Sequence, residues 1–170
     1  MTSSKTTSSK TTSSRTSDGH DGYRPNVGLM LIAPDRRIFV GCRVNQPDAW
    51  QMPQGGIDRG ESTIEAACRE LYEEIGTTKA LVLRESAKWI SYDVPEERRP
   101  PYWKGRWHGQ AQKWFALAFT GCDADIDIHA HDKEFESWRW IRAGELADLI
   151  VPFKRPVYDA VFEEFSDLIS

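Results

Sequence analysis

The chain has 170 residues, a formal net charge of -4 and 39% hydrophobic residues, which suits one globular domain with a sizeable core. No segment is apolar enough to span a membrane. The negative net charge argues against a general polyanion binder, so any contact with nucleic acid must come from a local patch. Three scattered cysteines without a Cys-x-x-Cys pair indicate neither a disulfide framework nor a zinc site, and we expect a cytoplasmic protein.

The first 21 residues differ in composition from everything that follows. Three copies of a Thr-Ser-Ser-Lys-Thr repeat, with Arg15 replacing lysine in the last copy, contain no acid and no large apolar side chain. Such a segment cannot offset the entropy lost on ordering. We therefore expect a disordered tail over residues 1–21 and one folded domain over residues 22–170. A weak contact between the tail and RNA phosphates is the alternative to a solvated tail.

The folded domain is predicted to begin with a β-hairpin. Val27–Ala33 is an apolar run between two prolines, which predicts a buried strand, and a turn signal separates it from the strand Ile38–Cys42. Trp50–Gln54 is predicted to be a short strand. It leads into a segment where Gly55 and Gly56 indicate an irregular loop with close backbone approach.

A helix is predicted after this loop. Ser62 and Glu65 have the spacing of a capping box at its start, and Gly76 suits its end. One apolar stripe falls at helical spacing, so Cys68 is expected in the core rather than as a reactive thiol. The stripe consists of Ile64, Ala67, Cys68, Leu71 and Ile75.

Three carboxylates share one face of this helix: Glu70, Glu73 and Glu74. With about 100° per residue, their centre lies roughly 125° around from the apolar stripe, so we expect them at the rim of the core. Like charges at this spacing destabilise an isolated helix, whereas a hard divalent cation with oxygen ligands would stabilise the arrangement. A metal site is therefore the hypothesis, and a solvated acidic face is the alternative.

The rest of the chain predicts more strands and two helices. Strands are expected at 81–83, 89–92, 112–119 and 136–141, with a long loop at 93–109, and helices at 144–150 and 153–169. Trp114 is expected in the core. Strands on both sides of one helix, followed by a terminal helix, predict an α/β (α+β) fold with a mixed sheet.

Residues 55–77 follow the pattern G-x5-E-x7-R-E-U-x-E-E-x-G, where U is a bulky aliphatic residue. This segment resembles the Nudix box, the signature of hydrolases that split nucleoside diphosphates linked to another moiety. The box usually ends in an aliphatic residue, where this chain has Thr77, a departure that concerns packing. The matching positions are Gly55, Glu61, Arg69, Glu70, Leu71, Glu73, Glu74 and Gly76.

The resemblance implies a Nudix-type α/β/α sandwich and a divalent cation, most often Mg²⁺, with Mn²⁺ or Zn²⁺ as alternatives. It implies that Glu73 and Glu74 bind the metal and that Gly55 contributes its carbonyl. Glu70 would be a ligand or the general base. Arg69 would orient a helix glutamate through a fork-like ion pair.

A carboxylate outside the box is also expected, because family members often recruit one. The candidate is Glu134, just before Trp138-Arg139-Trp140, as a further metal ligand or as the base. An exposed acidic turn is the alternative. No Ser/His/Asp arrangement competes with the glutamates.

The segments that flank the box resemble one branch of the family, which contains bacterial RNA 5′-pyrophosphohydrolases and the related dinucleoside tetraphosphate hydrolases of bacteria and plants. These segments are residues 22–28, 49–56, 109–115 and 153–158. We expect hydrolysis of the 5′ triphosphate of RNA to a 5′-monophosphate and pyrophosphate, which promotes RNA decay. The alternatives are hydrolysis of diadenosine tetraphosphate to ATP and AMP, and an inactive module that binds nucleotides or RNA ends.

Cations and aromatic residues near the box are the candidate substrate contacts. The cations suit a polyphosphate, and each aromatic ring that stacks on a base is worth about 1–3 kcal/mol. Basic and aromatic residues also alternate in the 93–109 loop, a pattern typical of RNA contacts. Ordinary surface cations and core aromatics are the alternatives. The candidates are Arg24, Arg43, Tyr92, Lys113, Phe153 and Lys154.

Overall fold

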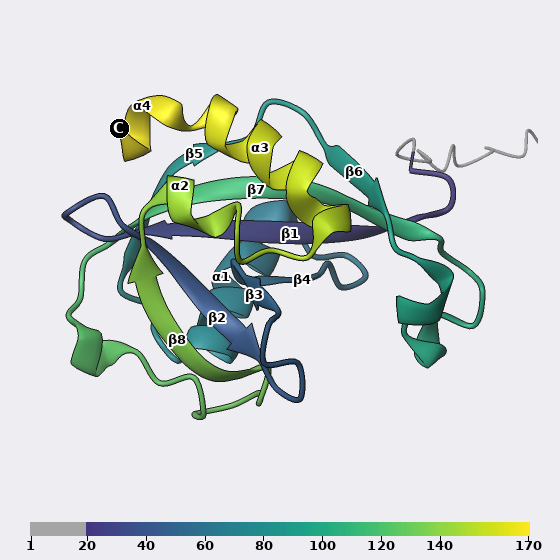
Figure 1. The fold of residues 1–170 in the computed structure, drawn as a ribbon, viewed down its shortest axis with the longest axis horizontal. Helices are drawn as coiled ribbons and strands as arrows, with labels where there is room; N and C mark the ends of the chain where they lie inside the picture. The colour runs from purple at the N-terminus through teal and green to yellow at the C-terminus, as the bar shows by residue number, and fades with distance from the viewer. Residues whose placement is uncertain (1–19) are drawn as a thin grey trace, which may run out of the picture.

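A computed structural model describes residues 20–170, so the tail predicted at the N-terminus lies outside the described residues up to residue 19. Within the described part, eight strands form one mixed sheet with helices on both faces (Figure 1). This arrangement confirms the predicted α/β class and its α/β/α layers. No helix between residues 20 and 170 has the length and apolar character needed to cross a membrane.

The strands are β1 (Tyr23–Ile32), β2 (Ile38–Arg43), β3 (Trp50–Gln51), β4 (Gln54–Gly56), β5 (Ala80–Glu85), β6 (Ile90–Asp93), β7 (Gly109–Phe119) and β8 (Phe135–Ile141). The helices are α1 (Thr63–Ile75), α2 (Ala143–Leu146), α3 (Arg155–Glu164) and α4 (Ser166–Ile169). Short 3₁₀ turns occur at Glu96–Arg98, Pro101–Trp103, Asp123–Asp125 and Pro152–Lys154.

The centre of the sheet is the parallel pair β1 and β7, in register from Tyr23 opposite Gly109 to Ile32 opposite Ala118. The other pairings are antiparallel: β2 and β4 with β1, β5 and β6 with β7, and β3 and β8 with β2. A parallel pair of this kind is covered on both faces. Accordingly β1 is buried without interruption from Asn26 to Ile32.

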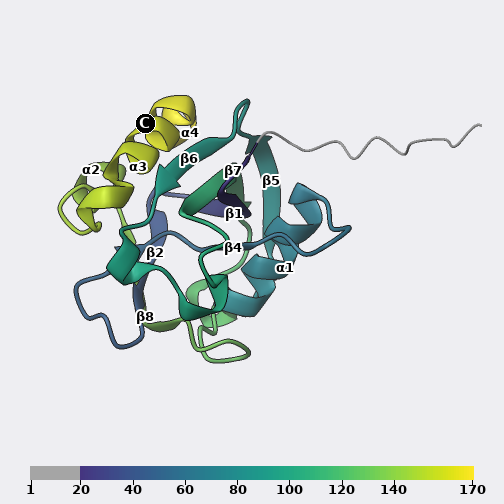
Figure 2. The same cartoon turned by 90° about the vertical axis from the view of Figure 1, so that its right-hand side faces the viewer.

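Two apolar cores lie on opposite faces of the sheet, with α1 on one side and α3 on the other (Figure 2). Side chains of β1 alternate between them, so that Met30 joins the core under α3 and Leu29 joins the core under α1. Trp114 is fully buried in the core under α3, as predicted. Its ring covers Gly28 on the neighbouring strand, where a Cβ atom would overlap it.

Helix α1 has the predicted ends but presents a different buried face. Ser62 and Glu65 form the capping box, and Gly76 closes the helix at a φ of 74°. The prediction that Cys68 lies in the core is wrong, because Cys68 is exposed, and Ile64 is also 39% exposed. The helix is rotated so that two of its glutamates face inward. The buried residues are Ala66, Ala67, Glu70, Leu71, Glu74 and Ile75.

The strand predicted at 50–54 is divided into β3 and β4. The Met52 N–H donates to the Tyr158 hydroxyl at 2.9 Å, and Pro53 has no N–H to offer a ladder. Gly55 and Gly56, expected in a loop, pair with β1 as part of β4. The glycine segment is therefore held rigidly by the sheet.

The helices predicted at 144–150 and 153–169 are shorter than expected. The first covers only α2, and the second divides into a 3₁₀ turn, α3 and α4. Pro156 has no N–H and cannot bond the carbonyl four residues earlier, so the α-helix begins only at Arg155. The backbone leaves the helical region at the fully buried Phe165, while Arg84 holds Asp167 at 2.8 Å.

The capping box gives a stability prediction. Replacement Ser62→Ala removes the acceptor for the Glu65 N–H and should lower the free energy of unfolding by about 1 kcal/mol, as measured by urea denaturation. Ser62→Thr should retain most of the stability because it keeps a capping hydroxyl. An alanine variant as stable as wild type would show that the cap contributes nothing in this fold.

Candidate metal and active site

Arg69 organises the acidic face of α1. Its Nε and Nη2 bind the two oxygens of Glu61 at 2.8 Å each, and its Nη1 donates to Glu70 at 2.8 Å and to Glu73 at 3.0 Å. Nη2 also donates to the Gly56 carbonyl at 2.8 Å. All five N–H groups of the guanidinium are thus occupied. The carboxylates, Glu61 foremost, raise the pKa of Arg69.

Glu70 lies directly against β4. A Cβ atom on Gly55 would overlap the Glu70 carboxylate, so glycine is required for this close approach. Burial raises the pKa of Glu70, and the ion pair with Arg69 opposes the increase. The inward position of Glu70 corrects the prediction that all three acids sit at the rim; Glu73 remains partly exposed.

Glu74 is a buried carboxylate without a cationic partner. It is 5% exposed, and it accepts one hydrogen bond, from the Gln54 N–H at 3.2 Å. Among residues 20–170 no lysine, arginine or histidine forms an ion pair with it. Burial raises the pKa of Glu74 well above its ordinary value, and the nearby carboxylates of Glu134 and Glu70 raise it further. Glu74 therefore lacks an ion-pair partner within the described part of the chain.

Two cations from distant parts of the chain stand close to Glu74 and Glu134. Arg43 at the end of β2 binds the Glu134 carboxylate at 3.1 Å. Lys154, buried before α3, donates to Gln51 at 2.8 Å and to Gln54 at 3.2 Å. Burial, followed by the charge of Arg43, lowers the pKa of Lys154 to about 7. The structure thus brings Glu134, Arg43 and Lys154 close together, while their roles stay predictions.

The acids fit a divalent cation in their chemistry, although their present conformation does not form a cage. No three acidic, histidine or cysteine side chains in the described part of the chain are arranged to hold a metal ion. Glu70 and Glu73 are instead turned onto Arg69. The donors are all oxygens, and the charge of Glu74 is uncompensated, which a hard cation would correct.

The predicted substrate contacts are not all in equivalent positions. Tyr92 is 8% exposed and its hydroxyl donates to Gln110 at 2.7 Å, so its ring is not free for stacking; the half-buried Phe153, 6.2 Å away, is more accessible. The Lys113 amine contacts the Ala87 carbonyl at 3.2 Å and Glu85 at 3.8 Å, on the side of β5. Arg24 lies against Gly56.

A network of mostly buried amides, which sequence reasoning did not single out, adjoins the site through Gln54, which contacts Glu74 and Lys154. Gln112 donates to Asn26 at 2.7 Å and to Gln54 at 3.2 Å, and Gln54 in turn donates to Gln110 at 3.2 Å. The side-chain oxygen of Gln112, Oε1, is buried without a hydrogen-bond partner among residues 20–170. These amides lie within the flanking segments that resembled the family branch, so the only available signal was that resemblance.

Comparisons with known proteins place this geometry in context. The chain matches the NUDIX domain family over residues 22–161. It is 55% identical over 144 residues to an RNA pyrophosphohydrolase of Rhodospirillum rubrum, which covers 85% of this chain and 87% of that protein. It is 50% identical over 148 residues to an RNA pyrophosphohydrolase of Rickettsia typhi, which covers 86% and 92%.

Solved structures share the fold at lower identity. The dihydroneopterin triphosphate pyrophosphohydrolase of E. coli superposes with a TM-score of 0.65 at 21% identity, covering 81% of this chain and 95% of that one. An Ap4A hydrolase of C. elegans superposes with a TM-score of 0.62 at 15% identity, covering 85% and 98%. At these identities the likeness concerns the fold alone.

The buried charge of Glu74 predicts a pH-dependent effect of its removal. Because the folded pKa is raised above the ordinary value of about 4.3, the stability from protonated Glu74 is present below that value and is lost as the pH rises through the folded pKa. In EDTA, Glu74→Gln should therefore gain stability over wild type between about pH 4.5 and pH 8, measured by urea denaturation. A difference independent of pH would contradict this.

Glu61 provides the matched control with the opposite sign. The ion pair with Arg69 lowers the pKa of Glu61, so its stabilising effect is present above the ordinary value and is lost as the pH falls through the folded pKa. Glu61→Gln should destabilise the protein at about pH 8, and the loss should shrink toward about pH 4.

Proposed function

Because the chain belongs to the NUDIX family, we propose that it is a metal-dependent pyrophosphohydrolase that acts on the 5′ triphosphate of RNA. Water and the triphosphate end yield a 5′-monophosphate end and pyrophosphate, and the exposed monophosphate promotes decay of the transcript. The carrying observation is the pair of curated relatives named RNA pyrophosphohydrolase, at 55% and 50% identity over most of the chain. The site supports it with carboxylates on one helix and cations opposite them.

We propose that glutamates of α1 bind the metal ion. Glu73 and Glu74 hold a divalent cation, with the Gly55 carbonyl as a further ligand, and Mg²⁺ is proposed because it prefers oxygen ligands. A bound ion of this kind supplies the charge that neutralises the phosphate oxygens. Arg69 positions Glu70 and Glu73 through its ion pairs.

Two carboxylates are candidates for the base that takes a proton from the attacking water. Glu70 is buried, and its raised pKa suits proton transfer near neutral pH, although it is equally suited to ligate the metal. Glu134 is 35% exposed at its side chain and is held by Arg43, so it is the alternative base or an additional ligand.

The cations opposite the acids are proposed to bind the phosphates. Lys154 has a pKa of about 7, so an incoming polyphosphate would favour its charged form and would relieve the cost of burying that charge. Arg43 forms an ion pair with Glu134 and is proposed to contact the phosphates as well. Phe153, which is half-buried beside Tyr92, is proposed to contact the first base.

Hydrolysis of diadenosine tetraphosphate to ATP and AMP is the second candidate. It uses the same metal and phosphate contacts, and residues 50–58 and 89–92 resemble that group as well. An inactive binding module is disfavoured because all the box glutamates are present. We also propose that the enzyme works in the cytoplasm, a reducing compartment that suits its three free cysteines.

The substrate proposal is tested by rates measured side by side. With Mg²⁺ present, kcat/KM should be higher for a 5′-triphosphorylated oligoribonucleotide than for diadenosine tetraphosphate, and pyrophosphate should appear as a product. Glu73→Gln should reduce kcat by at least about a hundredfold on both substrates, since a charged ligand is lost. Faster hydrolysis of diadenosine tetraphosphate would select the second candidate.

Metal binding should also be visible without turnover. Mg²⁺ binds the folded acid cluster and not the unfolded chain, so about ten times its Kd should stabilise the protein by about 1.4 kcal/mol and raise the Tm. Glu74→Gln should reduce that shift, while Glu145→Gln, a change on the exposed surface of α2, should leave it intact. An identical shift in both variants would remove Glu74 from the metal site.

A further inference from the structure

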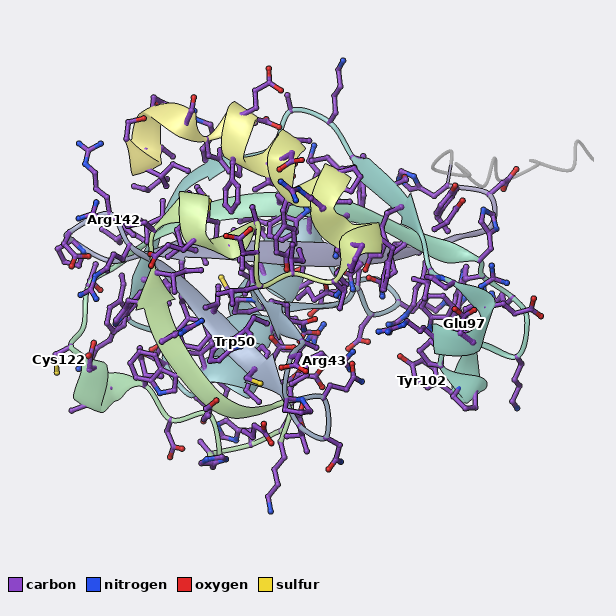
Figure 3. All side chains as sticks on the ribbon, in the orientation of Figure 1. Arg43, Trp50, Glu97, Tyr102, Cys122 and Arg142 are labelled. Carbon is purple, nitrogen blue, oxygen red and sulfur yellow. The ribbon has the colours of Figure 1, made fainter. Side chains whose placement is uncertain are left out.

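The segment between β6 and β7 projects beyond the sheet, and Tyr102 lies on the projecting part (Figure 3). Tyr102 is 65% exposed, the largest exposure of any large apolar side chain among residues 20–170. Its neighbour Trp103 is 2% exposed and belongs to the core under α3. Of these two neighbouring aromatic residues, Trp103 therefore stabilises the core, and Tyr102 is accessible to a ligand.

One cation, Arg24, lies against this ring and also against the ring of Trp107. The Arg24 guanidinium carbon lies 5.8 Å from the centre of the Tyr102 ring and 5.9 Å from that of Trp107. Arg106 lies 4.6 Å from the Trp107 ring. Residues 94–108 carry four basic and two acidic side chains, whereas the whole chain has a net charge of -4. The projection is thus a local positive patch with an open aromatic face.

Arg24 connects this patch to the glutamate site. Its guanidinium covers Gly56, where a Cβ atom would overlap it, and the Gly56 carbonyl accepts a hydrogen bond from Arg69 at 2.8 Å. Arg69 in turn holds Glu70 and Glu73. A continuous series of contacts therefore runs from the acids that would bind metal to the exposed ring of Tyr102.

We propose that Tyr102, backed by Arg24, is a stacking platform for a base of single-stranded RNA downstream of the 5′-terminal nucleotide. This inference rests on the proposed function and extends it, because it explains how the enzyme would favour a polymer over a free nucleotide. The aromatic face accepts any base, and the cations attract the backbone phosphates. The other exposed large apolar groups fit this partner less well. Leu81, Val82 and Leu83 on β5 are aliphatic, as is Ile64 on α1. The ring of Tyr72 packs against that of His131, with the ring centres 4.2 Å apart.

The kinetic test compares substrates with and without downstream bases. Tyr102→Ala should lower kcat/KM about tenfold on a 5′-triphosphorylated pentaribonucleotide, mainly through KM, and should leave the value for ATP unchanged. Tyr102→Phe keeps the ring and should behave as wild type. Tyr72→Ala removes an exposed tyrosine from α1 and should have no effect on either substrate. Equal losses on the pentanucleotide and on ATP, or no loss on either, would overturn the platform.

A binding test separates this inference from the proposed activity. Fluorescence anisotropy in EDTA would give the Kd of a 5′-monophosphorylated pentaribonucleotide, which should be about tenfold weaker for Tyr102→Ala than for wild type or Tyr102→Phe. If wild type failed to hydrolyse triphosphorylated RNA but binding still depended on Tyr102, the proposed function would fall and the platform would stand. If wild type hydrolysed that RNA and Tyr102→Ala bound the pentanucleotide as tightly as wild type, the platform would fall and the proposed function would stand.

Discussion

The five hydrogen bonds of Arg69 are the interaction on which the functional region depends. They join Glu61 at the start of the box, Glu70 and Glu73 on the helix, and the Gly56 carbonyl on β4. Three carboxylates can crowd around one guanidinium because its planar fork matches them in number and direction. Without this cation, α1 would carry its acids against the sheet at a large electrostatic cost.

Arg69 does not form ion pairs with all the carboxylates of α1, and the exception is relevant to ligand binding. Glu74 is buried beyond the reach of Arg69, with one backbone N–H as its hydrogen-bond partner. Lys154 is buried nearby and bonds to two neutral glutamines instead of a carboxylate. The Glu74 carboxyl and the Lys154 amine thus lie in one region, each without an ion-pair partner among the described residues. Such a pair suits a ligand that contains both a cation and an anion. A metal polyphosphate has that composition.

The sequence was most informative where local geometry decides the outcome. The capping box at Ser62, the end of the helix at Gly76 and the burial of Trp114 depend on short-range pattern, and all three are confirmed. The rotation of α1 was not predictable from the helix sequence. It depends on close packing of the Glu70 carboxylate against Gly55 on β4, where a side chain would overlap it. The amide network likewise joins β1, β4 and β7, and no single segment shows it. Residue roles in catalysis stay predictions.

The parallel pairing of β1 with β7 has a consequence for how the chain acquires its fold. Asn26 and Gln112, which meet in the buried amide network, are 86 residues apart in sequence. During synthesis β1 emerges early, but its central partner is completed only at Phe119. Pairings of such large separation form slowly and leave apolar strands unprotected in the meantime. The apolar segment Val27–Ile32 therefore cannot be covered by β7 until more than two thirds of the chain has been synthesised.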